Sequence, residues 1–336
     1  YAATLSEARI DQQMTPHTQP RRPNRRWRAG AILVAASLLM FMRCDDTTSP
    51  EPSRQELAGN DCIIVAGERI PTGTRVVTWL EPTGYSAYRE GKHFDRSEPP
   101  DGKRRYSERE GAVVTHGDLK QVLRQFVLHY DACGCSRQCF KVLQDVRGLS
   151  VHFMLDVDGT IYQTLDLREK AWHATVANND SIGIEIAHPG AWRSPLNADM
   201  RRWYEEDARG WRQRFPAWMQ EAGVRTPGFV PRPDRAEFVA GPIHGTTYHQ
   251  FDFTPEQYHA LPKLMAALNK ALPRIQLDAP RDARGDISSP ALSATALAEH
   301  DGVLGHFHVQ RNKQDPGPAF QWERVLREAR ALRGND

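Results

Sequence analysis

The chain has 336 residues, enough for one sizeable domain with extensions or for two small domains. Its contents of 40% hydrophobic and 26% charged residues are ordinary for a globular protein. With 44 basic and 42 acidic residues the net charge is only +2, which gives no case for nucleic acid as a partner.

Residues 1–55 have the pattern of a signal or anchor segment followed by a disordered linker. A cluster of arginines between positions 21 and 28 precedes an uncharged, mostly apolar run at 29–42. This run is shorter than the roughly 20 residues that span a bilayer, and a basic region before such a run is typical of an export signal. We therefore expect an exported protein of the periplasm or cell envelope.

Two questions about this segment stay open in the sequence. Cys44 stands where a bacterial lipoprotein carries its acylated cysteine, but the preceding Phe41-Met42-Arg43 matches poorly the small residues that lipoprotein processing requires. Lipid anchoring to a membrane and secretion are therefore both open. Met14 would place the arginines at an ordinary signal-peptide distance, so Tyr1 and Met14 are alternative starts.

The cysteines of an exported protein are expected to lie in an oxidising environment. Cys133, Cys135 and Cys139 cluster, but Cys133-Gly134-Cys135 is too tight for a zinc ribbon and no second pair follows. We predict a disulfide between Cys133 and Cys139. Cys135 and Cys62 either pair with one another or stay free.

The expected organisation is a small β-rich N-terminal arm at 56–111 and a main domain at 112–333. Alternating and apolar runs predict strands, turn residues predict hairpins, and helical periodicity with capping residues predicts helices. The expected strands are 62–65, 75–79, 126–129, 151–155, 160–164, 182–186 and 303–306; the expected helices are 136–145, 199–222, one opening at Thr254-Pro255, and 320–333; residues 274–300 form a surface insertion. This order predicts an α/β fold in which helices flank a mixed central β-sheet.

Polar residues that can bind a metal follow or end these strands. His129 closes an apolar strand, Glu185 lies in another, and Gly305-His306 ends the last one. Lys313 and Asp315 follow shortly afterwards. Two imidazoles and one carboxylate form the ligand set of a catalytic zinc site that keeps one position open for water. We therefore predict one zinc ion at the sheet edge, held by His129, His306 and Asp315.

The two remaining groups complete the chemistry of a zinc hydrolase. Bound zinc lowers the pKa of water to about 7, and a base must then manage the proton of that water. We assign this role to Glu185, with an ordinary buried core acid as the alternative. Lys313 would place an ammonium group near the developing oxyanion.

Six motifs occur in order along the chain. They are Val127-Leu128-His129-Tyr130, Ser150-Val151-His152-Phe153, Asp158-Gly159-Thr160-Ile161-Tyr162-Gln163, Ala171-Trp172-His173-Ala174, Ser181-Ile182-Gly183-Ile184-Glu185 and Asp315-Pro316-Gly317-Pro318. Together they resemble the zinc-dependent N-acetylmuramoyl-L-alanine amidases of type 2, which share their fold with peptidoglycan-recognition proteins. The resemblance covers roughly residues 113–325.

The resemblance implies a zinc amidase domain that cuts the amide between the lactyl group of N-acetylmuramic acid and the L-alanine of the stem peptide. The partner would be peptidoglycan or soluble muropeptides, and the protein a monomer. It also implies substrate contacts by His173, Trp172 and Tyr130, with a packed strand-end imidazole as the alternative for His173. A disulfide like the one between Cys133 and Cys139 lies beside the first ligand in peptidoglycan-recognition proteins.

The chain departs from the family pattern after the second ligand. His306 and His308 would point the same way on a strand, so either imidazole can reach the metal. We favour His306, because Gly305-His306 matches the family register. Two other functions stay open: a non-catalytic peptidoglycan-binding protein of the same fold, and an amidase whose groove, reshaped by 188–253 and 274–300, cuts another acyl-amino-acid bond.

Overall fold

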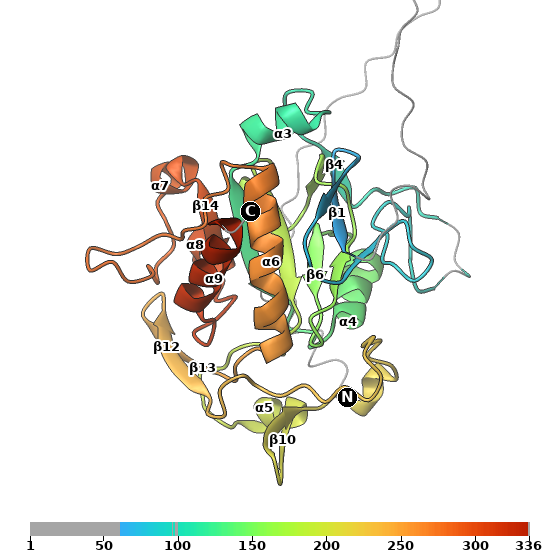
Figure 1. The fold of residues 1–336 in the computed structure, drawn as a ribbon. Helices are drawn as coiled ribbons and strands as arrows, with labels where there is room; N and C mark the ends of the chain where they lie inside the picture. Colours follow the sequence, from blue (N-terminus) through green and yellow to red (C-terminus); the bar gives the residue numbers. More distant parts are fainter. Residues whose placement is uncertain (1–60, 96, 98–99, 335–336) are drawn as a thin grey trace, which may run out of the picture. The chain divides into compact units, whose positions relative to one another are not determined.

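The computed structural model describes residues 61–95, 97 and 100–334 (Figure 1). The expected signal or anchor segment, its linker and Cys44 lie outside the described residues. Within the described part of the chain, no helix has the length and apolar character needed to cross a bilayer.

A six-stranded mixed sheet forms the centre of the fold, in the order β14-β5-β9-β6-β7-β3. Strands β14, β5, β9 and β6 run parallel, whereas β7 returns antiparallel to β6 through the Asp158-Gly159 turn and pairs in parallel with β3. The bounds are β3 (Val76–Thr78), β5 (Gln125–Tyr130), β6 (Phe153–Leu155), β7 (Ile161–Gln163), β9 (Ser181–Ile186) and β14 (Gly302–Gly305). The prediction of a mixed sheet within an α/β fold is confirmed.

Helix α6 (Pro255–Ala271) lies along one face of this sheet beside α9 (Trp322–Gly334), as Figure 1 shows. Thr254 begins α6 with a capping box: its side chain accepts from the Gln257 amide, while the Gln257 side chain accepts from the Thr254 amide. The apolar stripe of α6, including Leu261 and Leu264, packs into one core with the central strands β5 and β9. Both helices were predicted from capping and periodicity, and both are present.

Shorter elements surround this frame. The helices and helical turns are α3 (His116–Val122), α4 (Ser136–Phe140), η1 (Lys141–Arg147), η2 (Thr175–Ala177), α5 (Ala198–Trp203), η3 (Ala217–Met219), α7 (Ala294–Glu299) and α8 (His306–Val309). Four antiparallel pairs complete the description: β1 (Cys62–Val65) with β2 (Glu68–Pro71), β4 (Tyr106–Glu108) with β8 (Glu169–Ala171), β10 (Tyr204–Asp207) with β11 (Gly210–Gln213), and β12 (Val239–Ile243) with β13 (Thr246–Gln250).

The two central strands determine which face of the sheet carries polar groups. In β5 and β9 successive side chains point to opposite faces. Leu128 and Ile184 belong to the core that α6 covers. Their neighbours His129 and Glu185, which are paired in the sheet register, therefore face the opposite side.

The expected long helix at 199–222 is wrong. Only α5 and the short helical turn η3 are helical there, and the chain between them forms the β10–β11 hairpin. Gly210 has a φ of +96°, which suits the hairpin turn and not a helix. The aromatic side chains Trp203 and Tyr204 are buried in a separate small core, so tertiary packing overrides the helical pattern of the charged residues.

The segment at 56–111, expected to be a β-rich arm, contains the separate two-stranded sheet β1–β2 and two further strands that pair with later parts of the chain. Its strand β3 is an edge strand of the central sheet, and β4 pairs with β8. The expected helix at 136–145 is shorter as an α-helix, because α4 passes into the wider turns of η1 at Lys141.

The predicted disulfide is absent: Cys133 and Cys139 are both buried free thiols, as is Cys135, and Cys62 is free as well. The turn after β5 is held instead by Asp131, whose Oδ1 accepts hydrogen bonds from the amides of Cys133 and Gly134, each at 2.9 Å. A covalent link is therefore not needed to fix this turn.

The Asp156 side chain connects the end of β6 to the start of α4. Its burial can be tested through the pH dependence of stability. Its Oδ1 accepts from the amides of Ser136 and Val157, while its buried Oδ2 has no partner among the described residues. Burial raises the pKa of Asp156 to about 7, from an ordinary value near 3.9. Between these values the folded state keeps a proton that the unfolded state has released, so the free energy of unfolding falls as the pH rises from about 4 to about 7.

We therefore expect Asp156→Asn, which cannot ionise, to gain stability relative to the wild type between pH 4.5 and pH 8. The gain is about 3 kcal/mol, measurable by urea unfolding at both pH values. Asp158→Asn, in the same turn, is the control, because both oxygens of Asp158 are hydrogen-bonded. A stability difference between Asp156→Asn and wild type that is the same at both pH values would contradict a buried neutral carboxyl.

Candidate metal centre

Parallel pairing brings the candidate ligands together. His129 is in β5, and the last residue of β14, Gly305, pairs with Leu128 of β5. His306 follows at the first position of α8, so its ring lies beside that of His129 at the same edge of the sheet. Asp315 lies in the loop after α8, and the amide of Phe307, in α8, holds this loop by donating to the Asp315 carbonyl at 3.2 Å.

Three ligand atoms from these residues form a small triangle. Nδ1 of His129 is 2.9 Å from Nδ1 of His306, and Oδ2 of Asp315 lies 3.1 Å and 2.9 Å from these two nitrogens. The three side chains are buried, and they are the group of potential metal ligands found in the described part of the chain.

The geometry of this triangle fits a zinc ion. Zinc bonds of about 2.0–2.1 Å in a tetrahedral site place the ligand atoms about 3.3 Å apart. The three atoms would therefore have to spread by only a few tenths of an ångström. Two imidazoles and one carboxylate leave a fourth position for a water or a substrate oxygen.

Each imidazole has a partner on its far nitrogen, which fixes the ring. Nε2 of His306 lies 2.9 Å from Oε1 of Gln310, the residue that directly follows α8 and lies one helical turn after His306. Nε2 of His129 lies 3.0 Å from Nδ1 of His173. Such outer partners orient metal ligands. Sequence reasoning missed Gln310, because this segment was predicted to be extended and only a helix brings residues four apart together.

The charges in the triangle favour a bound cation. Burial alone would raise the pKa of Asp315, but the neighbouring His306 and His129 more than offset it and hold the pKa below its usual range. Burial, together with the nearby His306, lowers the pKa of His129 to about 4, so this imidazole is neutral near pH 7. A carboxylate and a neutral imidazole are the forms that bind a metal.

Glu185 and Lys313 lie close to the triangle, and burial shifts the pKa of both side chains. Burial raises the pKa of Glu185 well above its usual value, and the carboxylates of Asp315 and Asp131 add to this effect. Burial lowers the pKa of Lys313, while Asp315 and Glu185 oppose that shift. Within the described residues neither side-chain head group has a hydrogen-bond partner, so both are available to a substrate.

His308, the alternative ligand, lies away from the triangle. Residues two apart on a helix do not face the same way, and His306 and His308 are both in α8 rather than on a strand. Both ring nitrogens of His308 are occupied by backbone groups, Nδ1 by the amide of Gly305 and Nε2 by the carbonyl of Ser288.

The three expected substrate contacts lie in different surroundings, and direct contact with substrate stays a prediction for each. The His173 ring contacts His129 on the side away from the triangle. Trp172 donates from Nε1 to Ser107 Oγ at 3.2 Å, against strand β4. Tyr130 is 4% exposed and belongs to the core under α6, because it follows His129 in the strand and points to the opposite face. Its packing favours a structural role.

A hairpin that sequence reasoning did not place supports the loop of Lys313 and Asp315. Nε2 of His244, in the turn between β12 and β13, lies 3.0 Å from the carbonyl oxygen of Lys313. At the end of β13, side-chain Nε2 of Gln250 donates to the carbonyl oxygen of Pro316, and Oε1 of Gln250 accepts from the backbone amide of Ala319. The hairpin therefore holds this loop from one side.

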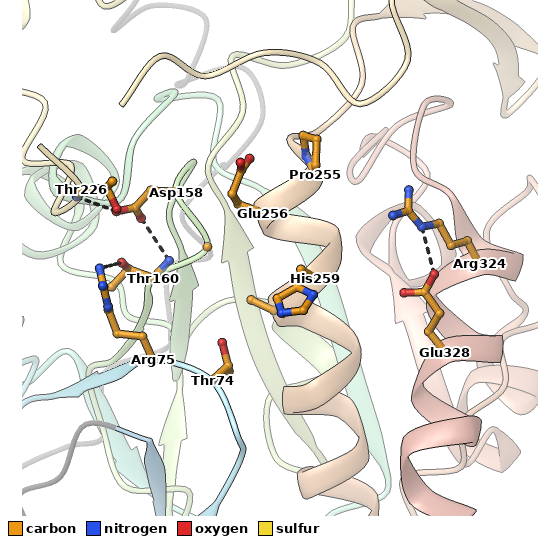
Figure 2. Close-up of a pocket in the computed structure, with 12 residues that line it drawn as sticks. Thr74, Arg75, Asp158, Thr160, Thr226, Pro255, Glu256, His259, Arg324 and Glu328 are labelled. Carbon is orange, nitrogen blue, oxygen red and sulfur yellow. Dashed lines mark hydrogen bonds and ion pairs between the residues drawn. The ribbon is translucent and has the colours of Figure 1, made fainter. Parts of the chain in front are cut away.

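A separate groove lies beside α6, between the Asp158-Gly159 turn and α9 (Figure 2). Figure 2 shows Glu256 and His259 of α6 between Asp158 on one side and the Arg324–Glu328 ion pair of α9 on the other. Because α6 covers the sheet face opposite to His129 and Glu185, this groove is not part of the metal centre.

The sequence profile of the family described as N-acetylmuramoyl-L-alanine amidase, Amidase_2, matches residues 119–318, more than half of the chain. The chain belongs to this family. All three triangle residues and both nearby charged groups of this Amidase_2 chain lie within the matched range. The family predicted from the six motifs is thus confirmed.

Three solved structures are similar to this Amidase_2 chain. The amidase AmiD from E. coli, in complex with the substrate anhydro-N-acetylmuramic acid-L-Ala-D-gamma-Glu-L-Lys, has 17% identity and a TM-score of 0.35 over 67% of this chain. The match spans 65% of AmiD, less than two thirds of its length. A selenomethionine derivative of AmpD has 17% identity and a TM-score of 0.33 over 67% of this chain and 90% of its own. AmpDh3 from Pseudomonas aeruginosa has 17% identity and a TM-score of 0.33 over 61% and 59%. The comparison with curated protein sequences finds no match.

Removal of one ligand tests the centre directly. We expect Asp315→Ala to weaken zinc binding by more than the roughly 10- to 100-fold that loss of an outer partner costs, because it removes the only anion of the triangle. Competition with a zinc chelator measures this. His308→Asn, in the neighbouring helix α8, is the control and is expected to bind zinc like the wild type; equal affinity of Asp315→Ala and wild type would contradict the site.

Proposed function

We propose that the protein is a zinc-dependent amidase that hydrolyses the amide between the lactyl group of N-acetylmuramic acid and the L-alanine of the stem peptide. The observation that carries this proposal is the triangle of His129, His306 and Asp315, in a chain of the Amidase_2 family. Its ligand set is the one that leaves a coordination position open for chemistry.

Zinc, when bound, supplies a Lewis acid that lowers the pKa of water and polarises a carbonyl oxygen. The protein then has to move protons, and Glu185 is placed for this role. It is buried at the end of β9, paired in register with His129. As a carboxylate it accepts a proton from the attacking water, and as a carboxylic acid it donates one to the departing amine. Its raised pKa suits the second step in particular.

Lys313 supplies positive charge where the scissile carbonyl develops negative charge. Its side chain is 5% exposed, so water screens its charge poorly. A fixed cation in a dry site stabilises an oxyanion without reorganisation. The His244 contact to the Lys313 backbone supports the loop that presents this ammonium group.

The substrate, the location and the assembly state follow from the same proposal. The substrate class is peptidoglycan or its soluble fragments, and AmiD, a similar structure, was solved with such a fragment. The basic and apolar segment at 21–42 supports export to the periplasm or cell envelope, where lipid anchoring through Cys44 and secretion are the alternatives. We propose that the protein acts there as a monomer.

The first test is mass spectrometry of purified peptidoglycan incubated with the full chain, with and without a chelator. We expect free stem peptides that begin with L-alanine, their release abolished by the chelator and restored by zinc. Bound zinc without release would indicate another amide substrate. Neither zinc nor release would indicate a non-catalytic binding protein of this fold.

The second test separates proton transfer from metal binding. We expect Glu185→Gln to keep zinc and to lose roughly 10²- to 10⁴-fold in turnover, the usual contribution of a general acid–base group. Zinc content and initial rates on a soluble muropeptide measure the two effects. An unchanged rate would overturn the role of Glu185, and loss of zinc would show that the carboxyl holds the metal centre together.

A further inference from the structure

A chain of hydrogen-bonding groups runs from the back of the first metal ligand into the protein. Nε2 of His129 lies 3.0 Å from Nδ1 of His173, and Nε2 of His173 lies 3.3 Å from Oγ of Ser181. Ser181 Oγ donates in turn to the carbonyl oxygen of Ala177 at 2.7 Å. We propose that His173 is a positioning residue that, with Ser181, fixes the tautomer of His129 so that Nδ1 presents its lone pair to the metal. This inference rests on the proposed metal-dependent function.

The Ala177 carbonyl, at the end of this hydrogen-bond chain, determines which group donates and which accepts in every bond of it. Ala177 O can only accept, so the Ser181 hydroxyl spends its hydrogen there and accepts from His173 Nε2–H. A neutral imidazole has one N–H, so Nδ1 of His173 is then an acceptor. It accepts a hydrogen bond from Nε2–H of His129. Nδ1 of His129 is thereby left with a free lone pair, and this is the atom in the triangle.

Strand β9 has a glycine at the position where the His173 ring packs against it. Gly183 lies two residues before Glu185 in β9, on the same face of the sheet. A Cβ at this position would lie 2.4 Å from Nδ1 of His173 and 2.6 Å from its Cε1. Any other residue at 183 would therefore displace the imidazole from His129.

The backbone of His173 is also anchored. The side-chain oxygen of Asn178 accepts hydrogen bonds from the amides of His173 and Ala174, at 3.1 Å and 2.6 Å. The ring of His152 packs edge-on against His173, with centroids 5.9 Å apart. Both ring nitrogens of His173 thus face protein partners.

Zinc affinity and the tautomer of His129 test this assignment independently. We expect His173→Phe to weaken zinc binding of the full chain roughly 10- to 100-fold, the usual cost of removing an outer partner of a metal ligand. Ser181→Ala keeps the ring and removes only the group that orders it, so it remains informative if His173→Phe does not fold. We expect it to weaken zinc binding in the same direction.

The spectroscopic readout needs no metal. Long-range ¹H–¹⁵N correlation spectra of the zinc-free wild type should show His129 as the Nε2–H tautomer, and Ser181→Ala should show a mixture. His188→Phe is the matched control, because it removes another buried imidazole, whose partners are Phe251 O, Tyr204 and the Gly190 amide. We expect its zinc affinity to equal that of the wild type.

The outcomes separate this inference from the proposed function. A wild type that binds no zinc but shows the ordered Nε2–H tautomer would overturn the metal-dependent function and support the hydrogen-bond chain. A wild type that binds zinc, with unchanged affinity and tautomer in both variants, would overturn the positioning role alone. Unchanged affinity with a raised KM in His173→Phe would also overturn it and assign His173 to the substrate.

Discussion

The parallel pairing of β5 with β9 on one side and β14 on the other is the constraint on which the site depends. This pairing puts His129 opposite Glu185 and delivers His306 next to His129. A slip of one residue in either ladder would turn the polar side chain to the α6 face and into the core. The apolar contacts of α6 with Leu128 and Ile184 thus fix the site as much as they stabilise the fold.

Burial then gives the site its chemistry. The same desolvation acts on every group, but its effect differs with the neighbours. Asp315 stays ionised because two imidazoles face it, whereas Glu185, which faces other carboxylates, has a raised pKa. One low-dielectric pocket therefore holds an ionised carboxylate for a cation and a second carboxyl group suited to carry a proton.

The sequence predicted those parts of the molecule that depend on local periodicity. His129 and Glu185 follow from apolar strands, and α6 follows from the Thr254 cap and its stripe of leucines. It failed where distant packing decides, as in 199–222, where buried aromatic residues and Gly210 produce a hairpin. The sequence also could not predict the hydrogen-bond partners of the ligand rings. Gln310 reaches His306 only across a helical turn, and His173 reaches His129 only because Gly183 leaves space for its ring. Composition suggested a disulfide where Asp131 in fact holds the turn.

The ligands of the triangle are far apart in the chain: His129 and Asp315 are separated by 186 positions. No portion of the polypeptide that ends before β14 can therefore hold a metal by this set, since β14 and the Asp315 loop follow all the other strands of the central sheet. Contacts of such sequence separation form late and slowly. The ligand triangle would then assemble only once β14 has docked beside β5, so a chain still emerging from the ribosome would lack it.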